Sequence, residues 1–387
     1  MIIVEGCPAS HRANGFIMAL DDKTAASGEG LARVQALDLL RLVAVLGVVL
    51  FHYGFRGPIA FGTTDVALPE LAWFARYGFL GVPIFFVISG FVIAYSAEGR
   101  TAAGFAIARI ARIYPGFIFY MTLTFLATLV FGPPHFETAL VQWAANLIIA
   151  APVLHQPYMD SAYWSLVYEV VFYSWVTLLM AAGLFRRRID VIVIVWLAIS
   201  LSNELAIGSV AINKLFLTDV SGFFATGLLI YQLYRGRQDA VLQCLLAAAV
   251  ACAVTQAVNN LAWLRDRSGA FFDDWIVAAI CLASILVIIQ ATRIRHLPFP
   301  PGVVVAVGGA TYPLYLLHQQ IGYDAFHWIG PVAHRTVIVV LIVFAIVLLS
   351  WATWRYVERP GQRYTKQAFT ALATRFGWAP RPVGFAI

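Results

Sequence analysis

The chain has 387 residues, of which 61% are hydrophobic and only 12% are charged, and its mean hydropathy is +0.80. Because a soluble domain carries about a quarter charged residues, this composition excludes a soluble enzyme and predicts a polytopic membrane protein. The formal net charge of +6 does not indicate a nucleic-acid partner, since basic residues in such proteins mostly mark cytoplasmic loops.

The N-terminal residues 1–35 mix Gly, Ser, Asp and Lys and contain no apolar run of signal-peptide length. We expect a disordered cytoplasmic tail, followed by a first hydrophobic helix that acts as an uncleaved anchor. Translation could begin at Met1 or at Met18. The four cysteines predict no disulfide framework, because three lie within apolar runs and the fourth stands alone in the tail.

Eleven apolar stretches are candidates for membrane spans. In chain order they are 37–55, 78–97, 113–132, 138–154, 164–185, 189–207, 216–234, 240–258, 272–291, 303–323 and 335–356. The basic clusters between them all fall on one side of the membrane only if 138–154 does not cross. Ten spans then place 20 of the 26 Lys and Arg residues in or next to cytoplasmic segments, a bias typical of correct topology.

This topology predicts an all-α membrane protein with about ten transmembrane helices and both termini in the cytoplasm. Residues 133–163 become an extracytoplasmic loop whose apolar part lies at the interface or re-enters the membrane. The predicted domains are the tail 1–35, a membrane domain 36–364 and a cytoplasmic C-terminal tail 365–387. We expect the protein in the cytoplasmic (inner) membrane, and its oligomeric state is left open.

The first span reads RLVAVLGVVLFH from Arg41 to His52 and places two ionisable side chains within an apolar segment. In a helix they point the same way within ~20° and lie roughly 16 Å apart along the axis. A long substrate with an anionic end could contact Arg41 while its reactive end reaches His52. Acyl-CoA has this shape, with phosphates at one end and a thioester at the other.

Each of these two residues also has a structural interpretation. Arg41 lies near the end of the span and could extend its guanidinium to the interface as a topology-determining charge. His52 could be a histidine that is hydrogen-bonded inside the protein and does no chemistry. The shared helix face and the fitting length favour a functional role.

The second span and the loop after it contain small and basic residues. Ser89 and Gly90, in FFVISGFVI, would let a neighbouring helix or a thin ligand arm approach closely, and helix packing is the simpler explanation. Arg109 and Arg112, in ARIARIYP, lie one helical turn apart at the inner interface. They could bind CoA phosphates through charge-assisted hydrogen bonds or serve only as topology-determining charges.

Two later spans carry further ionisable residues. Glu169 lies about a turn and a half inside the fourth span, in YWSLVYEVVFY, and His318 lies in TYPLYLLHQQ of the ninth expected helix. Both are expected at the same depth as His52. Buried ionisable residues in membrane spans are functional candidates by default, although three separately hydrogen-bonded polar residues are the alternative.

The loop segment HQPYMD, His155 to Asp160, matches the His-x4-Asp spacing of soluble glycerolipid acyltransferases. It lies in a loop with Pro157 between the two residues. Because the chain has eight histidines, such a match arises easily by chance, and we assign no function to it.

Six motifs occur in an order that resembles the acyltransferase-3 family of integral-membrane O-acyltransferases. They are the Arg-x10-His span, GVPIFFVISGFVI (81–93), RIARIYP (109–115), YWSLVYEVVFY (163–173), TYPLYLLH (311–318) and YVERP (356–360). The resemblance covers about residues 33–364. Where this chain has Leu39 and Leu40, the family often has a glycine, and Gln319 and Gln320 replace a frequent Trp-Pro. The second difference lies on the expected acceptor side.

The resemblance implies transfer of an acetyl or succinyl group from cytoplasmic acyl-CoA to a hydroxyl of an extracytoplasmic or lipid-linked glycan. It implies acyl-CoA as a co-substrate and neither a metal nor a tightly bound cofactor. The expected acyl-CoA-binding residues are Arg41, Ser89, Gly90, Arg109 and Arg112, and the expected catalytic residues are His52, Glu169 and His318.

In the expected mechanism, His52 is a general base or a transient acyl carrier, which the sequence does not distinguish. Glu169 would orient it or stabilise its imidazolium. His318, Tyr312 or Tyr315 would donate a proton or hydrogen bond to the thioester oxygen.

A different class of function would also use buried ionisable residues. A proton-coupled transporter of a small polar solute or a glycan precursor could place histidine and glutamate at one depth, but such proteins often contain inverted repeats. We find no repeat in the sequence. A non-catalytic sensor or scaffold gives no reason for the Arg–His spacing. Consumption of acyl-CoA would distinguish an acyltransferase from both.

Overall fold

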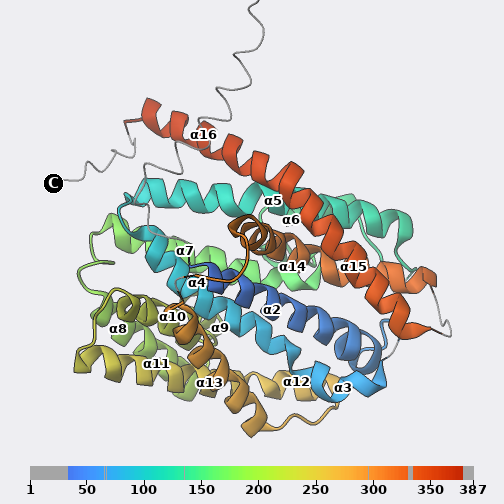
Figure 1. Ribbon diagram of the computed structural model, residues 1–387, viewed down its shortest axis with the longest axis horizontal. Coiled ribbons are helices and arrows are strands. Elements are labelled where there is room, and N and C mark those ends of the chain that lie inside the picture. The colour runs from blue at the N-terminus through green and yellow to red at the C-terminus, as the bar shows by residue number, and fades with distance from the viewer. Residues whose placement is uncertain are drawn as a thin grey trace, which may run out of the picture. The chain divides into compact units, whose positions relative to one another are not determined.

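The computed structural model describes residues 34–64, 66, 68–134, 136–294, 296–329 and 334–377 (Figure 1). The described residues form helices, turns and loops and no strand, which confirms the all-α prediction. The expected N-terminal tail lies almost wholly outside the described residues, as do the last ten residues of the expected C-terminal tail.

The helices follow one another through the whole described part of the chain. They are α2 (Gln35–Phe51), η1 (His52–Ala60), α3 (Pro69–Ala75), η2 (Arg76–Leu80), α4 (Gly81–Ala97), α5 (Ala102–Phe131), α6 (Leu140–Asn146), η3 (Ala151–Leu154), η4 (Ser161–Tyr163), α7 (Trp164–Ala181), α8 (Ile189–Ser202), η5 (Asn203–Ile207), α9 (Val210–Phe216), α10 (Ser221–Tyr234), α11 (Ala240–Asn259), α12 (Leu261–Ser268), α13 (Asp274–Ala291), α14 (Pro301–Ile329), α15 (Arg335–Thr353), η6 (Trp354–Glu358) and α16 (Arg359–Arg375).

Nine helical segments of the described residues are long and apolar enough to cross a membrane. They coincide with nine of the ten predicted spans, and the protein is a polytopic membrane protein. The tenth predicted span, 303–323, falls in α14, which has 29 residues but is not among the nine. Its apolar pattern is interrupted by buried polar side chains, which include Thr311, His318 and Gln319.

The segment 138–154 forms no spanning helix, as the charge pattern predicts. Its helix α6 has only seven residues, whereas a helix needs about 20 to cross the hydrocarbon core. The fully buried Asn146 holds this segment in place. Its amide donates hydrogen bonds to the carbonyls of Gln142 and Pro157, 2.9 and 3.0 Å away, and its oxygen accepts one from the backbone of Met159.

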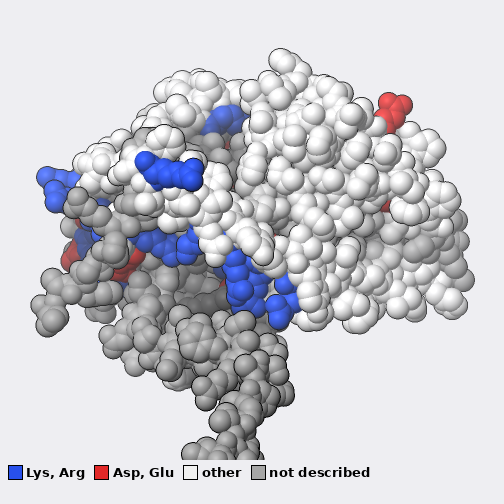
Figure 2. All heavy atoms as spheres, turned by 90° about the horizontal axis from the view of Figure 1, so that it is seen from above, with Lys and Arg blue, Asp and Glu red and all other residues white. Residues whose placement is uncertain are grey.

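Lys and Arg are distributed unevenly along the helix direction. On the face drawn in Figure 2 they gather on the left and at the lower centre, and the right-hand third shows none. Figure 1 places the turns from α4 to α5 and from α7 to α8 at the left end as well. The distribution agrees with basic loops on one side of the membrane, and the cytoplasmic position of the termini stays a prediction.

The helices α2, α4 and α14, near the middle of Figure 1, contact much of the rest of the fold. The helix α14 packs against α2, α5 and α15, and α4 packs against α2 and α10. The last helix, α16, lies along α5. This arrangement brings five motifs of the family resemblance close together, namely 41–52, 81–93, 109–115, 311–318 and 356–360.

Gly90 is a helix-packing residue. A Cβ atom there would lie 2.3 Å from the carbonyl oxygen of Phe224 and 3.0 Å from Cα of Gly227, so the backbones of α4 and α10 are in contact at this point. The structure therefore places a neighbouring helix, and not an open channel, against Gly90. Small residues at such crossings allow transmembrane helices to approach closely.

We expect Gly90→Ala to destabilise the protein by roughly 1–3 kcal/mol, because the added methyl group must push two helix backbones apart. The measurement is thermal unfolding in detergent. Gly302→Ala is the matched control, since a Cβ at Gly302 has no neighbour within 4 Å. Equal unfolding temperatures for the two variants would contradict the close contact.

Candidate active site

A cavity of about 250 Å³ lies among α2, α4, α5, α7 and α14. Its walls combine aromatic and aliphatic side chains with an unusual number of charged and hydroxyl groups. The polar residues that line it, tyrosines included, are Arg41, Ser89, Arg109, Arg112, Ser165, Glu169, Tyr173, Thr311, Tyr312 and Tyr315. Five of the eight predicted site residues therefore meet at one cavity.

The three arginines of the cavity differ in their partners. Arg41 lies 3.3 Å from the carboxylate of Asp38, and Arg112 forms an ion pair with Glu358. Arg109 has no ion pair with any carboxylate of the described residues, and its Nε atom is buried without a hydrogen-bond acceptor. Among the cavity arginines, Arg109 is thus the one whose charge is free to bind an anion.

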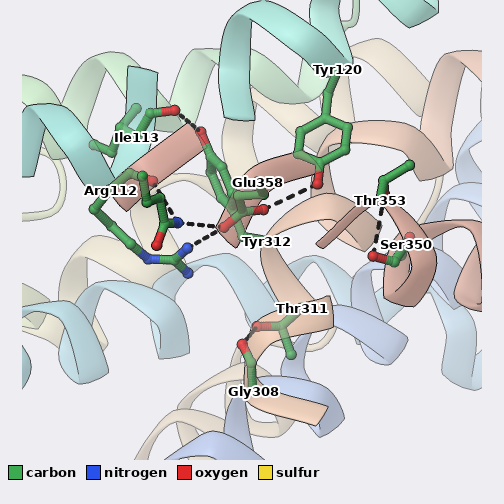
Figure 3. Close-up of polar contacts among 10 residues, drawn as sticks. Arg112, Ile113, Tyr120, Gly308, Thr311, Tyr312, Ser350, Thr353 and Glu358 are labelled. Atoms are coloured by element: carbon green, nitrogen blue, oxygen red, sulfur yellow. Dashed lines mark hydrogen bonds and ion pairs between the residues drawn. The ribbon is translucent and has the colours of Figure 1, made fainter. Parts of the chain in front are cut away.

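Glu358, at the end of η6, holds Arg112 in the cavity wall (Figure 3). Its side chain is fully buried. It accepts hydrogen bonds from Arg112, from the hydroxyl of Tyr120 at 3.1 Å and from the amide of Gln362 at 2.7 Å. The guanidinium of Arg112 also lies 5.2 Å from the ring centre of Tyr312. The orientation of Arg112 is fixed by Glu358 of η6 and Tyr312 of α14, while Tyr120 and Gln362 hold Glu358.

Sequence reasoning gave Glu358 no role. The motif YVERP contributed only to the family resemblance, although Glu358 is an acidic residue directly after a long apolar run. A buried acidic residue in a membrane span is a functional candidate. This rule identified Glu169, and applied to YVERP it would also have identified Glu358. Its partner could not be identified, because Arg112 lies 246 residues earlier in the chain.

Glu169 is hydrogen-bonded to Ser89 and not to His52. The Ser89 hydroxyl donates a hydrogen bond of 2.7 Å to the Glu169 carboxylate, which links α7 to α4 across the cavity. No direct hydrogen bond between Glu169 and His52 occurs among the described residues. The expected orienting role of Glu169 therefore has no contact in this structure, whereas its position on the cavity wall agrees with a role towards a ligand.

His52 and His318 form a pair next to the cavity. Their ring centres are 5.0 Å apart, both side chains are buried, and neither lines the cavity itself. The hydroxyl of Tyr323 lies 3.2 Å from Nδ1 of His52 and 3.3 Å from the His52 carbonyl oxygen. His52 and His318, which the sequence predicts at one depth, lie side by side.

The hydrogen bonds of His318 define its tautomer. Nδ1 lies 2.8 Å from the carbonyl oxygen of Tyr315, and a carbonyl can only accept, so Nδ1 carries the proton. The opposite nitrogen, Nε2, is buried and has no hydrogen-bond partner. A neutral His318 therefore presents Nε2 as a proton acceptor, and not as the proton donor expected from the sequence.

Tyr315 connects the histidine pair with the cavity. Its ring lines the cavity and lies 5.8 Å from the ring of His318. Its hydroxyl donates to the Ala162 carbonyl at 3.0 Å, and the Tyr312 hydroxyl donates to the Ile113 carbonyl at 3.1 Å. Both phenol protons that were expected to reach a thioester oxygen are thus bonded to the backbone here.

Asp160 fixes the loop before α7 against α14. Its carboxylate accepts hydrogen bonds from the backbone of Ala162 at 2.7 Å and of Gln320 at 2.9 Å, and its side chain is buried. His155, by contrast, is exposed, so the two residues of the HQPYMD segment do not form a catalytic pair. Asp160 holds α14 two residues from His318.

Burial raises the pKa of Asp160 from the ordinary aspartate value of 3.8 to about 6. Between these two values the folded protein binds more protons than the unfolded chain, so stability is lost as the pH rises through this window. We expect stability to fall by about 2 kcal/mol between pH 4 and 7 because of Asp160. The free energy of unfolding of wild type and of Asp160→Asn, measured over this pH range, gives the contribution of Asp160. Parallel pH profiles of the two proteins would contradict this contribution.

The arrangement combines an arginine-rich cavity wall with a buried pair of imidazoles. Among the described residues, no group of three or more His, Cys, Asp or Glu side chains could hold a metal ion. The cavity offers three guanidinium groups against one carboxylate, that of Glu169. Such a site can bind an anionic molecule and place part of it near two proton acceptors.

These features define an integral-membrane acyltransferase when they are combined with the comparison to known families. A family described as an acyltransferase domain matches residues 34–355. The chain therefore belongs to the acyltransferase-3 family. No curated protein and no solved structure matches it.

Proposed function

We propose that the protein is an acyl-CoA-dependent membrane O-acyltransferase. It transfers an acyl group, acetyl or succinyl, from cytoplasmic acyl-CoA to a hydroxyl of an extracytoplasmic or lipid-linked glycan such as an exopolysaccharide or lipopolysaccharide. The observation that supports it best is the cavity with three arginines next to the pair of His52 and His318. In this proposal the protein lies in the cytoplasmic (inner) membrane.

The donor binds with its phosphates on the arginine side of the cavity. Arg109 contributes the uncompensated charge, while Arg112, oriented by Glu358, and Arg41, held by Asp38, add donors in fixed positions. Hydrogen bonds from guanidinium to phosphate are charge-assisted and often bidentate. Ser89 and Tyr315 lie further along the cavity wall and flank the pantetheine arm in this proposal.

His52 is the general base for the acceptor hydroxyl. In this proposal the Tyr323 hydroxyl donates to the His52 carbonyl and accepts from Nδ1–H of His52, which leaves Nε2 of His52 basic. This nitrogen takes the hydroxyl proton while the hydroxyl oxygen attacks the thioester carbon. The carbon–sulfur bond then breaks, and the CoA thiolate leaves and takes up the proton from His52, which restores the base.

His318 assists through its free Nε2 atom. Its buried ring lies against that of His52, so it can accept a hydrogen bond from His52 when His52 carries the substrate proton. A neutral His318 stabilises that charge, whereas two adjacent imidazolium ions would repel each other. His318 therefore stays neutral during the transfer.

The test is CoA release by the purified protein in lipid nanodiscs. Acetyl-CoA and succinyl-CoA are supplied separately, with and without a membrane extract that contains lipid-linked saccharides, and the free thiol is measured. We expect thiol release that increases when the extract is present and that is matched by labelled acyl groups in the saccharide fraction. No thiol release with either donor and any extract would support the transporter alternative instead.

A further inference from the structure

A second, apolar groove lies on the other side of α7 and is separate from the candidate active site. It has a volume of about 480 Å³ and is formed by α7, α8, the end of α9 and α10. All but one of its lining residues are apolar, and they include Phe172, Trp175, Val195 and Trp196. The exception is Arg188.

The wall of the groove is held rigidly. The indole N–H of Trp175 donates to the Leu215 carbonyl at 2.8 Å, and that of Trp196 donates to the Phe216 carbonyl at 2.5 Å. The ring of Trp175 also stacks on that of Phe216, with centres 5.4 Å apart. With their polar atoms satisfied, the indoles present only apolar faces, so the groove suits a ligand without hydrogen-bonding groups.

The groove has a charged end and an apolar end. Arg188 precedes the first residue of α8, and lining residues continue along this helix to Ile199. Eleven residues of helix correspond to about 16 Å, which is close to the thickness of one leaflet, about half of a 30 Å hydrocarbon core. A neighbouring apolar hollow extends the groove beyond Ile199 to Ile207.

The charge at the mouth of the groove is positive. Arg188 has no ion pair with a carboxylate of the described residues, and Arg187 next to it is exposed. Asp190, the nearest acidic residue in sequence, is bound by Arg237, whose guanidinium nitrogens lie 2.6 and 2.8 Å from its carboxylate. The negative charge beside Arg188 is therefore neutralised, and Arg188 is available to an anion from outside.

We propose that this groove binds one acyl chain of an anionic phospholipid, whose phosphate contacts Arg188. The lipid comes from the leaflet on the side of the basic loops, because the charged end of the groove lies there. A lipid-linked saccharide of the opposite leaflet would place its phosphate at the other end, where the lining is apolar. Basic sites between transmembrane helices typically bind anionic lipid head groups.

The site also has a structural consequence for the active site. Helix α7 presents Glu169 and Tyr173 to the catalytic cavity and Phe172, Trp175 and Val176 to the groove. A bound acyl chain fills the space between α7 and α8 and packs against the face of α7 that is opposite the active-site cavity. The proposal does not depend on the transferred acyl group or on the acceptor.

The experiment is native mass spectrometry of the full-length protein with phosphatidylglycerol or phosphatidylcholine of identical chains. Val195→Trp fills the groove, and Leu201→Trp is its control, because Leu201 is exposed on the same helix but does not line the groove. Arg188→Gln removes the charge, and Arg187→Gln is the control for net charge.

We expect wild type and both controls to bind phosphatidylglycerol in preference to phosphatidylcholine. In Val195→Trp the fraction of protein that carries a first bound lipid should fall at least tenfold. Arg188→Gln should lose the preference for phosphatidylglycerol over phosphatidylcholine. Equal lipid binding by Val195→Trp and Leu201→Trp would overturn the proposal, as would an unchanged preference in Arg188→Gln. A wild-type dimer that Val195→Trp converts to a monomer would also overturn it, because a second copy would then cover the groove.

Discussion

Replacing His52 with alanine is expected to abolish acyl transfer while leaving the donor cavity intact. General-base catalysis contributes typically 10²–10⁴-fold, so we expect kcat to fall by at least about 100-fold with little change in acyl-CoA binding. His52 does not line the cavity, which is why binding should survive. Steady-state kinetics with direct measurement of acyl-CoA affinity would separate the two effects.

The matched control for this variant is His155→Ala. His155 is exposed in the loop before α7, so its removal should leave both kcat and affinity at wild-type values. If His52→Ala retained wild-type kcat, the imidazole pair would be structural and the proposed mechanism would be wrong. Circular dichroism and unfolding temperature would show whether a loss of activity reflects misfolding.

Substitutions of Arg112 and Glu358 are expected to have coupled effects on the free energy of unfolding, and the loss should be larger for Arg112→Gln than for Glu358→Gln. Arg112→Gln leaves the carboxylate of Glu358, whose side chain is 0% exposed, without its cationic partner. Removal of one partner of a buried pair typically costs about 3–5 kcal/mol, and the lower end applies here because Tyr120 and Gln362 still donate to Glu358. Thermal unfolding of the purified variants would measure the loss.

Glu358→Gln is expected to restore part of the stability that Arg112→Gln loses. Glu358→Gln is neutral and keeps an acceptor for Tyr120, so it should destabilise less than Arg112→Gln. The double variant should be more stable than Arg112→Gln alone, because no buried charge is left unpaired. Additive losses in the double-mutant cycle would mean that the ion pair does not determine the stability of this region.

The fold could be predicted largely from hydrophobic runs and charge asymmetry. Nine predicted spans coincide with spanning helices of the described residues, since apolar length directly reflects bilayer thickness. Helix α14 was harder to interpret, because its polar residues face other helices and lower its hydropathy. These side chains are tolerated because they are hydrogen-bonded inside the protein: Thr311 donates to the Gly308 carbonyl, His318 to the Tyr315 carbonyl and Gln319 to the Ser161 hydroxyl.

The candidate site was predictable as a set of residues but not as an arrangement. Arg41, Ser89, Arg109, Arg112 and Glu169 share one cavity, whereas Gly90 turned out to contact α10. Spacing along one helix could align Arg41 with His52, but it could not show that His318 lies between His52 and Tyr315 or that Glu169 pairs with Ser89. The contacts of His52 with His318 and of Glu169 with Ser89 join residues 80 or more positions apart, and sequence periodicity contains no information about them.

The central claim is that the arginine-lined cavity binds the CoA part of the donor. The most direct measurement is the affinity of unacylated coenzyme A for wild type, Arg109→Gln and the charge-matched control Arg187→Gln. A charged hydrogen bond is worth about 1.5–3 kcal/mol, so Arg109→Gln should bind coenzyme A roughly 10- to 100-fold more weakly, with Arg187→Gln unchanged. Equal affinities for all three proteins would contradict the assignment of this cavity as the donor site.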